Sequence, residues 1–75
     1  MVKVRNKLRY WRHQCQMDQN DFAEFLGINY SQYNRMEKHP EKYNPNKDTT
    51  WTMWLRLKEK FPDIHIEDLW EEYGD

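Results

Sequence analysis

Residues 17–37 read MDQNDFAEFLGINYSQYNRME, and this stretch predicts two short helices joined by a tight turn. Asp18 is typical of a helix N-cap, because its carboxylate can accept hydrogen bonds from the first free backbone amides. Gly27 indicates where this helix ends, since glycine takes a positive φ without steric cost. Asn29 is the next N-cap signal. Two short helices separated by a three-residue turn are typical of a helix-turn-helix. The predicted helices cover residues 19–26 and 30–38.

Apolar residues at helical spacing predict further helices on both sides of this pair. Before it, Val4, Leu8, Trp11 and Cys15 recur at i, i+4, i+7 and i+11. After it, a loop with two prolines precedes an apolar pattern that Pro62 ends. Three residues are suitable N-caps for that helix, namely Asn46, Asp48 and Thr49. The helices expected outside the central pair cover residues 3–14, 49–60 and 66–73.

The composition also favours helices over sheets. Twelve of the 75 residues are Phe, Trp or Tyr, whereas only two are glycine. Strands prefer β-branched residues, which are few here, and a small all-β domain needs several glycines for its turns. A chain of this length forms one small domain. We therefore expect a single all-α domain of five helices.

The central stretch resembles the helix-turn-helix of the Cro/cI-type family, also called the XRE or lambda-repressor-like family. The resemblance covers residues 6–72 and implies a lambda-repressor-like fold. It also implies sequence-specific binding of double-stranded DNA by a small prokaryotic or phage-type transcriptional regulator that acts as a repressor. Gln16 departs from the pattern, because the family usually has glycine there. The residues that carry the resemblance are Gln19, Ala23, Leu26, Gly27, Ile28, Asn29 and the ending Arg35-Met36-Glu37.

Side chains near the start of the second helix of this motif are the expected base readers. Such a helix enters the major groove, which is ~12 Å wide, so its N-terminal side chains face base edges. Gln32 can bond bidentately to adenine, and Arg35 can do so to guanine. A merely solvated helix face would also be polar, which leaves a second interpretation open. The predicted base contacts are Tyr30, Ser31, Gln32, Asn34 and Arg35.

Amide and basic side chains around the motif are the expected phosphate contacts. In the family, the glutamine at the start of the motif's first helix helps to bind a phosphate, and the resemblance implies this role for Gln19. Basic residues neutralise phosphates where they face DNA, although charged residues often only coat a solvated surface. The predicted phosphate contacts are Gln19, Arg9, Lys38 and Lys42.

The resemblance further implies an ion pair between Arg12 and Glu37. In the family, an arginine of the first helix pairs with a glutamate at the end of the third helix. Both residues would then belong to the framework, and neither would touch bases. If the pair is buried, loss of one partner costs about 3–5 kcal/mol.

The net charge of −1 conceals an uneven charge distribution. Residues 1–38 carry a net charge of +3, and residues 39–75 carry −4. This asymmetry predicts a basic half that meets an anionic partner and an acidic half kept away from it.

The sequence contains more large apolar residues than a five-helix core of this size needs. These residues either complete the core or form a self-association patch, and family members commonly form dimers that bind two-fold DNA sites. A third interpretation is a protein-interaction module on the same fold, of the antitoxin or anti-repressor type. The predicted dimer or partner surface consists of Trp51, Met53, Leu55, Trp70 and Tyr73.

The sequence contains no pattern that predicts catalysis, a metal or a membrane span. Its His and Cys residues lack zinc-ligand spacing, so we expect neither a metal nor another cofactor. No nucleophile, paired carboxylates or glycine-rich phosphate loop indicates an enzyme. No apolar run reaches 18 residues, and no secretion leader opens the chain. We expect a cytoplasmic protein that associates with the nucleoid when it binds DNA.

Overall fold

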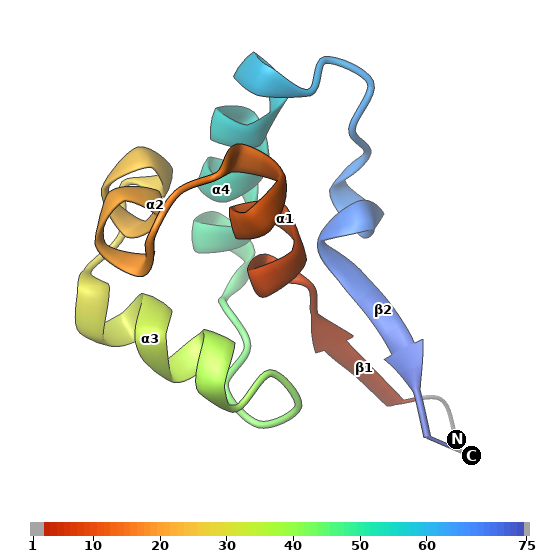
Figure 1. The fold of residues 1–75 in the computed structure, drawn as a ribbon. Coiled ribbons are helices and arrows are strands. Elements are labelled where there is room, and N and C mark those ends of the chain that lie inside the picture. The colour runs from red at the N-terminus through yellow and green to blue at the C-terminus, as the bar shows by residue number, and fades with distance from the viewer. Residues whose placement is uncertain (1–2, 75) are drawn as a thin grey trace.

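The computed structural model describes residues 3–74 and contains both helices and a small sheet. Four α-helices form the body of the molecule, and a two-stranded antiparallel ribbon extends from one corner of it (Figure 1). The prediction of an all-α, five-helix fold is therefore wrong. The elements are β1 (Lys3–Asn6), α1 (Leu8–Cys15), α2 (Gln19–Leu26), α3 (Tyr30–Lys38), α4 (Lys47–Lys60), the 3₁₀ helix η1 (Ile66–Leu69) and β2 (Trp70–Tyr73).

The predicted first helix over residues 3–14 is in fact a strand followed by a shorter helix. Val4 fits the helical spacing, yet it is 48% exposed and contributes nothing to an inward helix stripe. Asn6 ends β1, and its side-chain Oδ1 accepts a hydrogen bond from the Leu8 backbone N–H at 3.2 Å. That contact satisfies one free amide at the start of α1 and marks the change from strand to helix.

The predicted fifth helix over residues 66–73 is likewise divided, into η1 and β2. Strand β2 pairs with β1 in a register that joins Lys3 to Tyr73 and Asn6 to Trp70. The Lys7 backbone N–H continues this ladder with a 2.8 Å hydrogen bond to the Leu69 carbonyl. The two segments form strands because they pair with each other, although more than 60 residues separate them in the sequence. The spacing of apolar residues within each segment cannot show such a long-range pairing.

Each of the remaining α-helices begins at a clear N-cap residue. Helices α2 and α3 cover the ranges predicted from the sequence, with Asp18 accepting from the Asp21 N–H at 2.8 Å and Asn29 accepting from the Ser31 N–H at 2.8 Å. Helix α4 starts two residues before the predicted position of 49, because Asn46 is the cap and accepts from the Thr49 N–H at 2.7 Å. This hydrogen bond resolves the ambiguity about the cap.

The hydrophobic core lies between the four helices and η1. Ala23 is 1% exposed, and a small residue there lets α2 approach its neighbours. The core fixes α2 against both α3 and α4, which sets the angle at which α3 is presented. The buried core residues are Leu8, Phe22, Ala23, Leu26, Tyr33, Met36, Met53, Leu57, Ile64 and Leu69.

Gln16 adopts a left-handed backbone conformation, with φ 57° and ψ 41°, directly after α1. This conformation is unfavourable for a residue with a Cβ atom and costs glycine nothing. We expect Gln16→Gly to raise the free energy of unfolding by about 0.5–1 kcal/mol, measured by urea denaturation. Gln14→Gly, inside α1, is the matched control and should lower it by about 1 kcal/mol. A loss of stability in Gln16→Gly would contradict this account.

Candidate nucleic-acid interface

The turn between α2 and α3 places α3 on the surface of the molecule. Gly27 has φ 78°, and its backbone N–H points back to the last turn of α2. Only one side of α3 is buried, through Tyr33, Met36 and Glu37. The opposite side therefore faces outward along the whole length of the helix.

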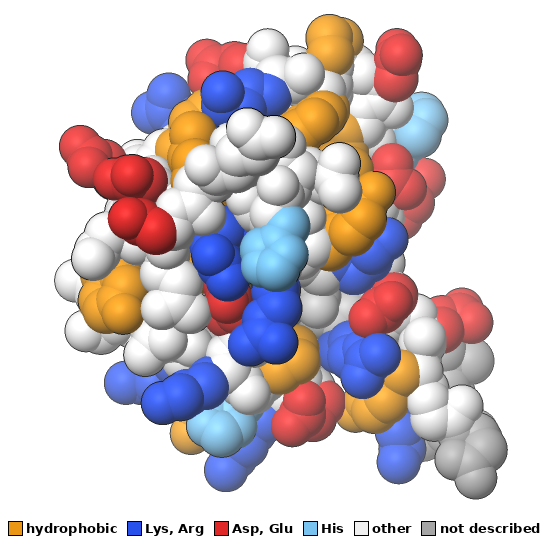
Figure 2. Space-filling view, in the orientation of Figure 1, with side chains coloured by type: hydrophobic (Ala, Val, Ile, Leu, Met, Phe, Trp, Pro, Cys, Tyr) orange, Lys and Arg blue, Asp and Glu red, His pale blue; other side chains and the backbone are white. Residues whose placement is uncertain are grey.

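The outward side of α3 forms a shallow polar hollow. Four of the five predicted base contacts line it, together with the predicted phosphate contact Lys38. Gln32 is exposed as well, but it lies outside this hollow, on the flank of the helix. Figure 2 shows Lys and Arg side chains along the lower edge of the molecule, over α3 and the loop that follows it. The residues that line the hollow are Tyr30, Ser31, Asn34, Arg35, Lys38 and His39.

Glu37 is the centre of a hydrogen-bond network on the inner side of α3. Its side chain is 1% exposed. Arg12 makes a two-point contact with it, from Nε to Oε2 at 3.1 Å and from Nη2 to Oε1 at 3.0 Å. The Tyr33 hydroxyl also donates to Glu37 Oε2. The pair that the resemblance implied is therefore present in the structure, as part of a larger cluster.

The network keeps Glu37 ionised despite its burial. Burial by itself raises the pKa of a carboxyl group, but the hydrogen bonds from Arg12, Tyr33 and Gln19 outweigh it and lower the pKa of Glu37 below its usual value. The hydrogen bond to Glu37 raises the pKa of Arg12. Burial, reinforced by the hydrogen bond to Glu37, raises the pKa of Tyr33. Glu37 is thus a buried anion with a complete set of hydrogen-bond donors. A buried carboxylate without such donors would destabilise the folded state.

Gln19 connects this buried cluster to the outer surface. Its side-chain Nε2 donates to Glu37 Oε1 at 3.1 Å, and its Oε1 accepts from the Tyr30 hydroxyl at 3.2 Å. These two contacts fix the orientation of the amide group. An amide nitrogen has two N–H groups, so one remains for an anion at the start of α2. Gln19 therefore lies where α2 and the outward side of α3 meet.

The other predicted phosphate contacts lie at separate places around α3. Arg9 projects from α1 with a side chain that is 66% exposed, and its Nε is 3.4 Å from Glu37 Oε1. Lys42 is exposed in the loop after α3, with its ammonium 5.5 Å from the centre of the Tyr43 ring. Lys38 lies at the hollow itself. These cations surround α3 on more than one side.

The expected separation of a basic half from an acidic half is wrong at the sheet. Pairing of β1 with β2 brings the two ends of the described chain together. Arg5 Nε lies 2.8 Å from Glu71 Oε1, and the Arg5 guanidinium also lies 5.1 Å from the centre of the Tyr73 ring. Arg5 is therefore engaged with the acidic end and is partly neutralised there.

The predicted dimer or partner surface is not one surface. Met53 is 1% exposed and belongs to the core, so for this residue the core interpretation is correct and the surface interpretation is wrong. Trp51 and Leu55 are 52% and 47% exposed, one turn apart on α4. Trp70 and Tyr73 are half-buried on β2 instead. Apolar residues lie on both sides of α4, so their spacing alone could not show which side is buried. The elements packed against α4 decide that.

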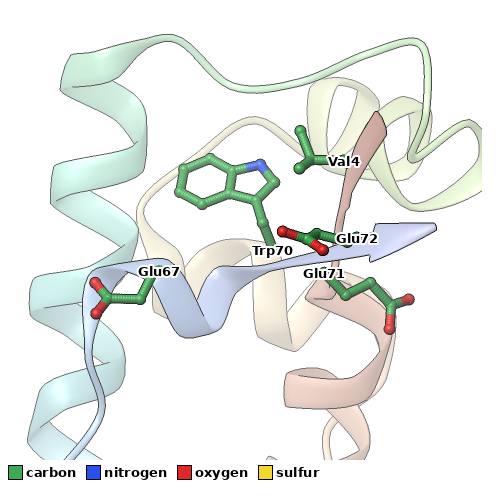
Figure 3. A pocket seen from close by; sticks show the side chains of 5 residues that line it. All are labelled: Val4, Glu67, Trp70, Glu71 and Glu72. Carbon is green, nitrogen blue, oxygen red and sulfur yellow. The ribbon is translucent and has the colours of Figure 1, made fainter. Parts of the chain in front are cut away.

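Trp70 forms one wall of a second hollow, of about 400 Å³, at the sheet. Figure 3 shows its indole ring beside Val4, with Glu72 close to both and Glu67 farther away, on η1. Glu71 also lines this hollow, although its carboxylate pairs with Arg5. The hollow is thus apolar at its centre and acidic around its edge.

Residues 3–74 contain neither a cluster of potential metal ligands nor a helix that could cross a membrane. Nowhere in this range do three or more His, Cys, Asp or Glu side chains gather closely enough to bind a metal ion. Within the same range, every helix is too short or too polar to cross a membrane.

No protein-family model, curated protein or solved structure matches this chain. The side chains around α3 are therefore the evidence from which a function can be inferred.

Two further residues shape the candidate interface, and the sequence-based predictions included neither of them. Tyr43 is the one apolar residue in the predicted loop, and it lies against Arg35. Asn6 is 5% exposed, and its side-chain Nδ2 donates to the Met36 carbonyl at 3.0 Å, near the end of α3. The isolated aromatic ring in a polar loop was a usable signal for Tyr43, whereas the contact of Asn6 depends on the tertiary fold.

Proposed function

We propose that the protein binds double-stranded DNA sequence-specifically through α3 and acts as a small transcriptional regulator of prokaryotic or phage type. The observation that carries this proposal is the exposed polar side of α3, with Arg35 and Lys38 in its hollow and Gln19 at its edge. The turn at Gly27 leaves this side free to meet a groove. The resemblance to the Cro/cI-type helix-turn-helix supports the same interpretation.

In this proposal α3 enters the major groove and reads base edges. Arg35 bonds to guanine O6 and N7, and Gln32 bonds to adenine from the flank of the helix. Tyr30, Ser31 and Asn34 complete the base contacts. Gln19 and the first amides of α2 bind one phosphate, because a helix N-terminus attracts anions. Arg9, Lys38 and Lys42 contact further phosphates on either side of the groove.

We further propose that the protein binds as a homodimer and represses transcription by occupying its site in the cytoplasm. Two-fold symmetry would place two α3 helices in successive major grooves, one helical turn of DNA apart. A single short helix can make only a few base contacts. A dimer would double that number.

The test is selection of bound sequences from a random DNA pool, followed by titration of the selected sequence. We expect an enriched site with two inverted halves. With three cationic phosphate contacts per subunit, from Arg9, Lys38 and Lys42, affinity per subunit should fall roughly tenfold to a hundredfold between 50 and 200 mM salt. No enrichment, together with no binding at about 50 mM salt, would refute the proposal.

A second candidate function is that of a protein-interaction module, of the antitoxin or anti-repressor type. The observation in its favour is the hollow beside Trp70, whose apolar centre and acidic edge suit a partner segment that is both apolar and basic. Such a partner would bind at the sheet, away from the outward side of α3. The two functions therefore depend on different residues and can be separated by substitution.

A further inference from the structure

The loop after α3, residues 39–46, folds back against the end of that helix. The backbone N–H groups of Lys42 and Tyr43 both donate to the His39 carbonyl, at 3.0 and 2.9 Å. The Asn6 backbone N–H donates to the Pro40 carbonyl at 3.3 Å, which ties the start of the loop to β1. Asn46 then begins α4 as its cap. The loop is thus anchored at both ends and at its first turn.

This arrangement places the Tyr43 ring beside the guanidinium of Arg35. The Arg35 Cζ lies 5.5 Å from the centre of the ring, and the His39 ring meets Tyr43 edge-on at 5.7 Å. The Lys42 ammonium lies 5.5 Å from the same ring. Within residues 3–74, no carboxylate lies at ion-pair distance from Arg35. Among the described residues, no carboxylate therefore competes with the Tyr43 ring for the Arg35 guanidinium.

The chemistry of the two side chains makes this contact useful for base recognition. A guanidinium is planar and weakly hydrated, so it can lie against an aromatic ring and still present N–H donors at its edge. A free arginine side chain loses rotamer freedom when it binds, and ordering it beforehand reduces that loss. Lys42, a compact and strongly hydrated charge, gains less from the ring and stays available for a phosphate.

We propose that Tyr43 is a positioning residue that orders the Arg35 guanidinium for base recognition. This makes the loop over residues 39–46 a determinant of sequence specificity, although Tyr43 itself touches no base. The inference depends on the DNA-binding function proposed above. It goes beyond that function, because it predicts that a loop residue with no base contact of its own affects DNA affinity through Arg35.

The first experiment needs no DNA. In the NMR spectrum of the free protein, ring currents from Tyr43 should shift the Arg35 Nε–Hε signal. Tyr43→Leu should move that signal toward the position of an unstructured arginine, whereas Tyr43→Phe should leave it nearly unchanged. An unchanged signal in Tyr43→Leu would overturn the positioning role, whether or not the protein binds DNA.

The second experiment measures affinity for the DNA sequence selected from the random pool. Tyr43→Leu should weaken binding roughly two- to fivefold, and Tyr43→Phe should retain the wild-type affinity. The matched control is Tyr10→Leu on α1, where the Lys7 ammonium lies 4.7 Å from the centre of another exposed ring. We expect this variant to bind as the wild type does. Tighter binding by Tyr43→Leu would show that the ring sequesters Arg35 and would overturn the proposal.

A double-mutant cycle separates action through Arg35 from a direct contact with DNA. In an Arg35→Ala background, Tyr43→Leu should cause no further loss of affinity. Additive losses would mean that Tyr43 acts independently and would refute the positioning role. If the wild-type protein selects no DNA at all, the specificity role and the proposed function both fail. A normal selection with no effect of Tyr43→Leu removes only the specificity role.

Discussion

Replacement of Arg12 by alanine is expected to lower the free energy of unfolding by about 3–5 kcal/mol. The variant would leave Glu37, with a 1% exposed side chain, as a buried carboxylate without its two-point partner. A domain of this size is stabilised by roughly 4–11 kcal/mol, so the loss removes a large part of the total. Thermal and urea denaturation followed by circular dichroism would measure it.

Arg9→Ala is the matched control for this prediction. Arg9 lies on the same helix and contacts the same carboxylate, but its side chain is 66% exposed and its Nε is 3.4 Å away. An exposed ion pair contributes about 0–1 kcal/mol, so this variant should be nearly as stable as the wild type. If the two substitutions lowered the free energy of unfolding equally, the burial of Arg12 would not explain the contribution of its ion pair to stability.

The pH dependence of stability provides a second measurement of the same network. The folded state lowers the pKa of Glu37, so it binds fewer protons than the unfolded state does. The contribution of Glu37 is therefore fully present above the unfolded pKa of about 4.3 and is lost as the pH falls through the lower, folded pKa. In Arg12→Ala the pKa of Glu37 should rise, and stability should fall less steeply in acid. An unchanged acid limb would argue against this coupling.

The double substitution Gln32→Ala and Arg35→Ala is expected to abolish specific DNA binding. Each bidentate base contact contributes about 1–3 kcal/mol of discrimination, so loss of both should reduce affinity for the selected sequence by about two orders of magnitude or more. Both side chains are exposed on α3, so folding should be unaffected. Fluorescence anisotropy with labelled DNA would measure the loss, and circular dichroism would verify the fold.

Two controls make this second prediction specific. Gln14→Ala with Arg56→Ala removes the same residue types from exposed positions on α1 and α4, and Figure 1 shows the second half of α4 running away from α3. This control should bind DNA normally. Trp70→Ala should also keep contact with a single half-site, while it weakens a dimer or a protein partner at the sheet. If Trp70→Ala abolished half-site binding and the double substitution did not, the assignment of the two surfaces would be reversed.

Local sequence signals located the central pair of helices and the residues that surround the proposed interface. Asp18, Gly27 and Asn29 act through hydrogen bonds and backbone angles within a few residues, so their effect can be recognised without a fold. The alternation of buried and exposed residues on α3 follows from helical periodicity for the same reason. The side of α3 that faces outward was therefore predictable before any contact was known.

Longer-range contacts explain where the sequence-based predictions were wrong. Val4 fits a helical spacing with Leu8, yet residues 3–6 pair with residues 70–73 at the other end of the chain. The sequence left open whether Met53 belongs to the core or to a partner surface, because the inner side of α4 is defined only by the elements packed against it. Short segments have weak intrinsic preferences, and a distant strand or helix can outweigh them.

The helix-turn-helix segment, its caps and the polar character of the outer side of α3 could be predicted from the sequence, because they depend on interactions between near neighbours. Three other features became known only from the folded structure: the pairing of residues 3–6 with residues 70–73, the four donors to Glu37, and the position of Tyr43 beside Arg35. Each of these features joins residues that are separated in the chain or turned toward each other by the fold. Their geometry is set by packing of the whole domain, which no local pattern encodes.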